Sequence, residues 1–223
     1  MQKKVDLKKL SVTAMLAGLA YLCMFIFKFR VMFLTFDLKD AVLAIIAFLY
    51  GPAYGVVSAA LVAVLEFATV SDTGVYGLIM NALSSAAFVA VLGTFYKYRR
   101  TLLGAVLGSV AAVFAMTAVM LIANIFITPY YMGAPRTEVI AMIPTLLLPF
   151  NLIKGIVNAA LTMVIYKPIT SALKRTGLTY SSAGKTDLKK FVPLAICAII
   201  ILIIAILVIT LVLNGEFLFL PKK

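Results

Sequence analysis

The chain has 223 residues, of which 64% are hydrophobic and 13% are charged, and its mean hydropathy is +1.13. These values exclude a soluble globular domain, because a soluble chain of this size cannot bury so much apolar surface. The net charge of +12 does not indicate a nucleic-acid partner, because most basic residues flank apolar blocks, as membrane topology requires. The blocks are continuous and close to the ~20 residues that cross a bilayer as a helix. They predict an all-α integral membrane protein rather than a barrel.

The first apolar block, residues 10–27, follows a run of lysines and in this respect resembles a signal peptide. It has no small-residue cleavage pattern, so we expect a span that stays in the membrane. Ala14, Ala17 and Gly18 lie on one side of this helix, where small residues allow a second helix to approach closely. Two interpretations stay open: packing within the chain, or a docking face for another membrane protein.

Residues 41–68 are long enough for one helix or for two shorter ones. The segment YGPAYG at 50–55 favours two, because Gly-Pro is a strong turn signal and Pro52 suits the first turn of a new helix. With this break and a cytoplasmic N-terminus, thirteen basic residues lie inside and six outside; without it, seven lie inside and twelve outside. The excess of positive charge on the cytoplasmic side therefore predicts seven helices, with the C-terminus outside.

The other predicted spans are 75–96, 102–128, 144–166 and 191–213. The expected organisation is a six-helix core (1–176), a cytoplasmic linker (177–190), an additional transmembrane helix (191–213) and a short tail (214–223). The additional helix has no polar side chain in its centre, which predicts a lipid-facing appendage. Cys23 and Cys197 each lie inside an apolar block, and we interpret them as small packing residues.

Polar side chains inside the predicted spans are few, and in lipid each needs a polar partner or a wet cavity. They are Asn81, Asn124, Asn151, Lys154 and Asn158. The last three follow an i, i+3, i+7 spacing and form one stripe. If Pro149 lies near a helix start, Lys154 is roughly 8 Å inside the outer end of its helix. We therefore expect Asn124, Asn151, Lys154 and the outer-loop residues Tyr130 and Tyr131 to converge on a pocket open to the outside.

Each of these polar residues also has a structural interpretation. Asn81 and Asn158 can hydrogen-bond between helices, and Lys154 can extend its ammonium to the outer interface. A lysine on the same stripe as Asn151 favours a ligand site over an interfacial side chain.

The acidic residues are expected at less central places, and the sequence predicts no enzymatic activity. Glu66 is expected at the outer interface, and Asp37 and Asp40 at the N-terminal cap of the second helix. The chain has no histidine, and residues 182–186 lack the upstream glycine of a Walker A motif. We expect no ATPase activity, and no acid–base relay of the kind that a proton-coupled carrier needs.

Several motifs together carry a family resemblance. The most specific is PFNLIKG at 149–155, and the supporting ones are FDLKD at 36–40, YGP at 50–52, Met80 with Asn81, and Asn124 with PYY at 129–131. With them, residues 7–176 resemble the riboflavin-specific S components, the substrate-binding subunits of energy-coupling factor (ECF) vitamin transporters. Ala14 and Gly18 are similar to the small-residue motif by which S components meet the shared coupling subunit, although alanine is usual at the second position.

The resemblance implies a six-helix protein of the bacterial cell membrane that captures riboflavin outside, with the first outer loop as a lid. Flavin mononucleotide (FMN) is a second candidate ligand, and no other cofactor is implied. A transmembrane coupling (T) subunit and two cytoplasmic ATPase subunits would supply the energy. The substrate-binding residues that it implies are Leu38, Asp40, Asn81, Asn124, Tyr130, Tyr131, Asn151 and Lys154. The helix at 191–213 departs from the family.

Two alternatives stay open. One is an S component for another vitamin, such as biotin or thiamine; thiamine sites favour acidic and tryptophan contacts, and this chain has no tryptophan. The other is a free-standing small-molecule carrier, which would tend to show internal repeats that are not evident here.

Overall fold

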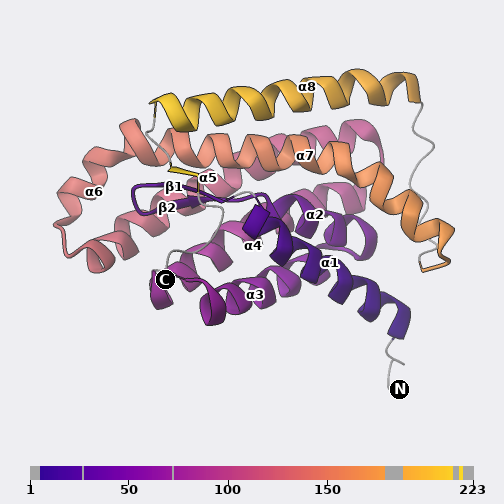
Figure 1. Ribbon diagram of the computed structural model, residues 1–223, viewed down its shortest axis with the longest axis horizontal. Coiled ribbons are helices and arrows are strands. Elements are labelled where there is room, and N and C mark those ends of the chain that lie inside the picture. The colour runs from indigo at the N-terminus through magenta and orange to yellow at the C-terminus, as the bar shows by residue number, and fades with distance from the viewer. Residues whose placement is uncertain (1–5, 27, 72, 179–187, 213–215, 218–223) are drawn as a thin grey trace.

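The computed structural model describes residues 6–26, 28–71, 73–178, 188–212 and 216–217. Its helices run roughly along the long axis of the molecule (Figure 1). They are α1 (Leu7–Ile26), α2 (Lys39–Tyr50), α3 (Pro52–Thr69), α4 (Gly74–Tyr98), α5 (Leu102–Met132), α6 (Arg136–Met142), the π-helical turn η1 (Ile143–Leu147), α7 (Leu148–Arg175), α8 (Leu188–Leu207) and a second π-helical turn η2 (Val208–Val212).

The break that the sequence predicts after residue 50 is present. Gly51 has φ +101°, a backbone conformation that favours glycine, and Pro52 begins α3. Helix α2 has 12 residues and is buried over residues 39–49, so it lies inside the bundle and contacts α1, α3, α4 and α7. At 1.5 Å per residue it is too short to cross a bilayer alone.

Five helical segments in the described part of the chain are long and apolar enough to cross a membrane. They are α1, α3, α4, α5 and the continuous segment Arg136–Arg175, which joins α6, η1 and α7. The apolar part of α8 and η2, Ala195–Leu211, is slightly shorter. The chain is therefore an α-helical multi-pass membrane protein, while the count of six core helices plus one stays a prediction.

Residues 28–40, expected as a loop, form a β-hairpin followed by the start of α2. Strands β1 (Phe29–Val31) and β2 (Leu34–Phe36) pair antiparallel, and a third strand β3 (Glu216–Phe217) pairs with the other edge of β1. The first and third residues of β1 and β2 are buried and the middle residue is half-buried, which is the alternation of a strand with one face covered. Three-residue strands are too short for this pattern to be detected in sequence.

Two expected helix boundaries were wrong. Helix α5 continues through the predicted outer loop to Met132 and ends at Gly133, which has φ +64°. Pro129 removes one backbone hydrogen bond, but it lies in the last turn, where its carbonyl accepts the Gly133 N–H. Pro149 is the second residue of α7, but the helical segment starts earlier, at Arg136. The π-helical turn η1 contains Pro144 and directly precedes α7, so it accommodates the prolines inside this longer segment.

Helix α8 lies along α7 at one edge of the molecule, and α3 lies at the opposite edge (Figure 1). Ala198, Ala205 and Ile209 are buried, whereas Ile204 and Leu207 are exposed. One face of α8 therefore packs against the rest of the molecule, and a lipid-facing role for the exposed face stays a prediction. Most of the predicted linker and tail falls at 179–187 and 218–223, outside the described residues.

Candidate ligand-binding site

A pocket lies between the β-hairpin and helices α4, α5 and α7; its empty space, about 620 Å³, includes the open solvent at its mouth. Its apolar and aromatic wall includes Phe33 and Leu34 from the hairpin, Tyr76 and Met80 from α4, and Phe150 from α7. The polar residues that line it are Thr35, Thr73, Asn81, Ser84, Asn124, Thr128, Asn151 and Lys154. A largely apolar cavity with a few placed polar groups is the usual form of a small-molecule site.

Of the eight substrate-binding residues predicted from the sequence, the structure brings five to this pocket. They are Asn81, Asn124, Tyr131, Asn151 and Lys154. Leu38 and Asp40 are buried close behind the hairpin but do not line the cavity. Tyr130 is 73% exposed and also lies outside it. The consecutive tyrosines point in different directions because they follow one another on a helix, not in a loop.

The two asparagine side chains from α5 and α7 are held in place by their own helices. Asn124 Nδ2 donates to Met120 O (2.7 Å), and its Oδ1 accepts from Thr128 Oγ1 (2.8 Å). Asn151 Nδ2 donates to Leu147 O (2.7 Å). Each amide nitrogen carries a second N–H, so both side chains keep a donor for a ligand in an orientation that is already fixed.

Lys154 connects the pocket wall to the hairpin. Its Nζ donates to Thr35 O on β2 (3.2 Å) and to Asp37 Oδ2 (3.1 Å). The residue is only 3% exposed, so the ammonium does not extend to the interface. An ammonium group has three donors, and two of them are used here. The third is therefore available to an acceptor in the pocket.

A buried chain of ion pairs continues from Lys154 across the bundle. Asp37 Oδ2 also lies 3.3 Å from Lys39 Nζ, which in turn lies 2.7 Å from Glu66 Oε2 on α3. Two lysines and two carboxylates thus balance their charges at sites with almost no solvent exposure, where an unpaired charge would be costly. Glu66 was expected at the interface, and this was wrong. The residue is 4% exposed, and its carboxylate pairs with the buried ammonium of Lys39 inside the bundle.

The two aspartates that flank Lys39 do not act alike. Asp37 Oδ1 accepts from the backbone N–H of Lys39 (3.3 Å), but the N-cap residue of α2 is Leu38, so Asp37 is not the predicted cap. Asp40 does not cap this helix; its Oδ1 accepts a hydrogen bond from Ser85 on α4. Asp40 Oδ2 has no partner among the described residues.

Asn158 has a structural role in this arrangement. Its Oδ1 accepts from Ala41 N (3.0 Å), and its Nδ2 donates to the backbone oxygens of Asp37 and Lys154 (3.0 Å each). It therefore fixes the start of α2 against α7. With Asn151 and Lys154 it lies on the predicted stripe, and all three are buried.

Sequence reasoning missed three polar groups around this pocket. The Thr35 carbonyl and Asp37 bind Lys154, and the buried Ser84 hydroxyl at the pocket wall has no partner among the described residues. A signal for Asp37 was present, because Asp37, Lys39 and Asp40 form a dense charged group beside an apolar segment. Such charges are stable in a membrane protein only when they are paired.

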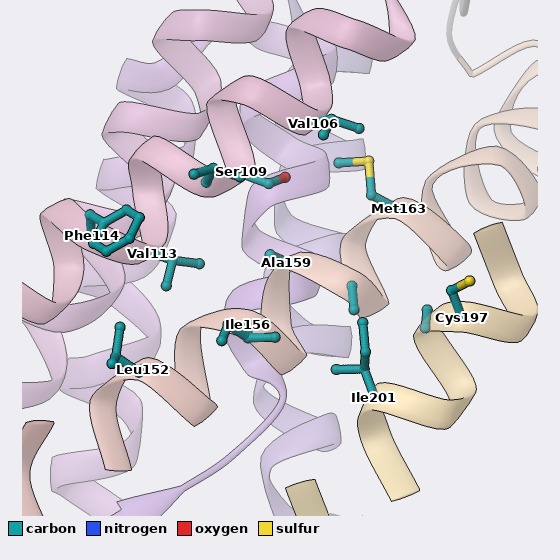
Figure 2. A pocket seen from close by; sticks show the side chains of 13 residues that line it. Val106, Ser109, Val113, Phe114, Leu152, Ile156, Ala159, Met163, Cys197 and Ile201 are labelled. Atoms are coloured by element: carbon teal, nitrogen blue, oxygen red, sulfur yellow. The ribbon is translucent and has the colours of Figure 1, made fainter. Parts of the chain in front are cut away.

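A second, larger cavity of about 910 Å³ lies between α5, α7 and α8. Figure 2 shows it lined by apolar side chains such as Phe114, Ile156 and Ile201, with Cys197 on α8 at its edge. Its hydroxyl group, Ser109 Oγ, already donates to Ala105 O on its own helix (2.8 Å). This apolar groove has size but no polar groups that could orient a hydroxylated ligand, so we do not assign the site to it.

The predicted docking residues lie on α1, which packs against α2 and α3. Ala14 and Gly18 are exposed, and no atom lies within 4 Å of a Cβ built at Gly18. Ala17 is half-buried and packs against the core. Ala14 and Gly18 therefore do not serve helix packing within this chain, and their role in docking stays a prediction.

The fold and the pocket define a class of protein: a helical membrane protein with a largely apolar pocket, carrying a few polar groups, between a β-hairpin and its helical bundle. Residues 8–166 match the family model described as ECF transporter, substrate-specific component, and the chain belongs to this family. Helix α8 and strand β3 lie outside the matched residues.

Relatives and a solved structure agree with this assignment. The chain is 29% identical to the riboflavin transporter RibU of Staphylococcus aureus (75% of this chain, 93% of the relative). It is 30% identical to the riboflavin transporter FmnP of Bacillus subtilis (73% and 92%). A solved structure of the S component of a bacterial ECF transporter superposes with a TM-score of 0.64 at 29% identity, covering 75% of this chain and 98% of that one.

Proposed function

We propose that this chain captures riboflavin in the pocket beneath the β-hairpin. The observation that supports this most directly is the set of Asn124, Asn151 and Lys154 around one largely apolar cavity, in a chain whose relatives are riboflavin transporters. Riboflavin combines a flat apolar ring system with ring carbonyls and a hydroxylated chain. The aromatic wall suits the ring, and the amide and ammonium donors suit the oxygens.

The test is a titration of the purified protein with riboflavin, followed by quenching of flavin fluorescence. We expect a Kd below about 1 μM, a free energy of binding stronger than about −8 kcal/mol. A protein that purifies without flavin and does not quench added riboflavin would contradict the proposal. Titrations with FMN, biotin and thiamine in parallel would separate flavin specificity from the other vitamins.

FMN is the second candidate ligand within the same proposal. Lys154 offers an ammonium donor at the pocket wall, and an ammonium group pairs well with phosphate. The ammonium is already shared with Asp37, however, so we expect FMN to bind more weakly than riboflavin.

We further propose that transport requires a transmembrane T subunit and two ATPase subunits, with the T subunit docking on α1 at Ala14 and Gly18. The exposed small residues on α1 and the family assignment support this. Proteoliposomes with the chain alone should bind riboflavin without accumulating it. Uptake by the chain alone would favour the free-standing carrier instead.

The proposed orientation in the bacterial cell membrane places the N-terminus in the cytoplasm and the hairpin outside. Labelling of single cysteines introduced at Lys97 and at Arg136 with a membrane-impermeant reagent tests it. Both positions are exposed and lie at opposite ends of the bundle. Intact cells should label only the cysteine at position 136.

A further inference from the structure

The C-terminal segment of the chain reaches the hairpin that covers the pocket. Strand β3 pairs antiparallel with β1, with Phe217 opposite Phe29 and Glu216 opposite Arg30. The strand order is β2-β1-β3, so β3 occupies the edge of the sheet away from β2 (Figure 1). Phe33, Leu34 and Thr35 line the pocket, so β2 lies at the pocket and β1 separates it from β3 in the sheet.

Helix α8 and η2 are joined to the hairpin by packing as well. Ile209 (0% exposed) and Ala205 belong to one apolar cluster with Phe29 and Val31 of β1 and with Val157 of α7. This contact is independent of the strand pairing, because it involves side chains on the helical part of the segment. The C-terminal segment thus meets the hairpin by strand pairing and shares a buried apolar cluster with it.

On the pocket side of the hairpin, two contacts involve residues of the pocket wall. The Thr35 carbonyl accepts from Lys154, and the Phe33 ring lies 6.4 Å from the Tyr131 ring. Both contacts are with residues that line the pocket and that a ligand can displace. Movement of the hairpin away from the pocket would then disturb its pairing with β3 and the apolar cluster that it shares with η2.

We infer that α8, η2 and β3 form a strap that restrains the hairpin and slows the entry and release of the ligand. The identity of the ligand in this inference rests on the proposed function. The restraint of the hairpin by the strap does not depend on that function. The family model ends at residue 166, so the strap is an addition to the part of the chain that matches the family. A chain of this family without it would open its pocket more readily.

A first experiment loosens the strap in the full chain. Ile209→Ala removes a buried side chain, and Leu211→Ala, two residues away, removes one that is 75% exposed and serves as the matched control. Hydrogen–deuterium exchange of the amides at 29–36 is measured in lipid nanodiscs, without ligand. We expect exchange about three- to tenfold faster for Ile209→Ala, because lost packing favours local opening. Riboflavin release should accelerate by a similar factor, with little change for Leu211→Ala.

A second experiment tightens the strap. Arg30→Cys with Glu216→Cys, in a chain with Cys23→Ala and Cys197→Ala, places two thiols at directly opposite positions of an antiparallel pair. Opposite Cα atoms in such a pair lie about 4.5–5.5 Å apart, within the range for a disulfide. Oxidation should slow both hairpin exchange and riboflavin release at least about threefold, and reduction should restore them. Arg30→Cys alone is the control for oxidation.

The two readouts separate the two proposals. Unchanged exchange at 29–36 in both experiments would overturn the strap, whether or not riboflavin binds. Faster exchange in Ile209→Ala together with no flavin binding in any variant would support the strap and contradict the riboflavin proposal. If Ile209→Ala fails to fold, the reversible disulfide decides the matter.

Discussion

The two faces of α7 adjoin cavities of opposite character. One face carries Asn151 and Lys154 into the pocket beneath the hairpin, and the other carries Leu152, Ile156 and Ala160 into the apolar groove beneath α8. The groove is the larger space, but its walls give a ligand no fixed orientation. The pocket is smaller and has donors whose positions are set by hydrogen bonds. Our assignment of the ligand site to the pocket therefore rests on placed polar groups rather than on volume.

The stripe of polar residues on α7 also determines where the hairpin lies. Lys154 binds Thr35 and Asp37, and Asn158 binds the backbone on both sides of the α2 start. The same face of the helix therefore positions the hairpin and carries the residues that we propose contact the ligand. The groove face makes no such polar contacts, so substitutions on the two faces should have very different effects.

The largest expected effect on binding comes from Lys154→Ala. It removes a charged donor from the pocket and leaves Asp37 with one cation fewer in a buried place. We expect riboflavin affinity to fall about 100-fold, or roughly 3 kcal/mol. Ile156→Ala, on the groove face, is the matched control and should stay close to the unmodified protein. Equal affinities of the two variants in fluorescence titration would refute the assignment of the site.

The next effect concerns stability rather than binding. Glu66→Gln removes one of the two carboxylates that pair with Lys39, which is fully buried. We expect a loss of about 2 kcal/mol in the free energy of unfolding, because a buried charge loses part of its compensation. The thermal unfolding midpoint in detergent measures it. Glu138→Gln on the exposed side of α6 is the control, and an equal midpoint for both variants would show that the ion-pair chain does not stabilise the bundle.

A smaller effect is expected from Asn151→Ala. Its amide already bonds to Leu147 O, so one donor and one acceptor at most are lost to the ligand. We expect riboflavin affinity to fall about tenfold, the loss of one or two neutral hydrogen bonds. Leu152→Ala, the next residue on the groove face, should change affinity much less. A larger loss in Leu152→Ala would mean that packing of α7, and not the amide, controls the pocket.

The sequence was sufficient for the class of fold and for the stripe on α7, because both follow from simple spacings. Blocks of apolar residues predict spans, and an i, i+3, i+7 pattern needs no tertiary contact to be recognised. The break at Gly51 was predictable for the same reason. Gly51 has φ +101°, a backbone conformation that favours glycine, and a Gly-Pro pair is a local sequence signal for such a turn.

The rest depended on contacts between segments far apart in the chain. Glu66 was misplaced because its partner, Lys39, lies 27 residues away and only the packing of α2 against α3 brings them together. The strands at 29–36 were missed because three residues are too few for a pattern. The pairing of β3 with β1 joins opposite ends of the sequence, which no local signal encodes.

The smallest expected effect completes the comparison between the faces of α7. Ala160→Leu adds apolar volume to the groove, which has room for it and no polar group to disturb. We expect riboflavin affinity to change less than about twofold, within the range usual for substitutions away from a site. Asn158→Leu, two positions earlier but on the polar face, is the contrasting variant: it breaks the bonds to Ala41 and Asp37 and should weaken binding through the hairpin. If Ala160→Leu weakened riboflavin binding as strongly as Asn158→Leu, a change in the groove would alter the pocket through α7. The two faces of α7 would then not affect riboflavin binding independently.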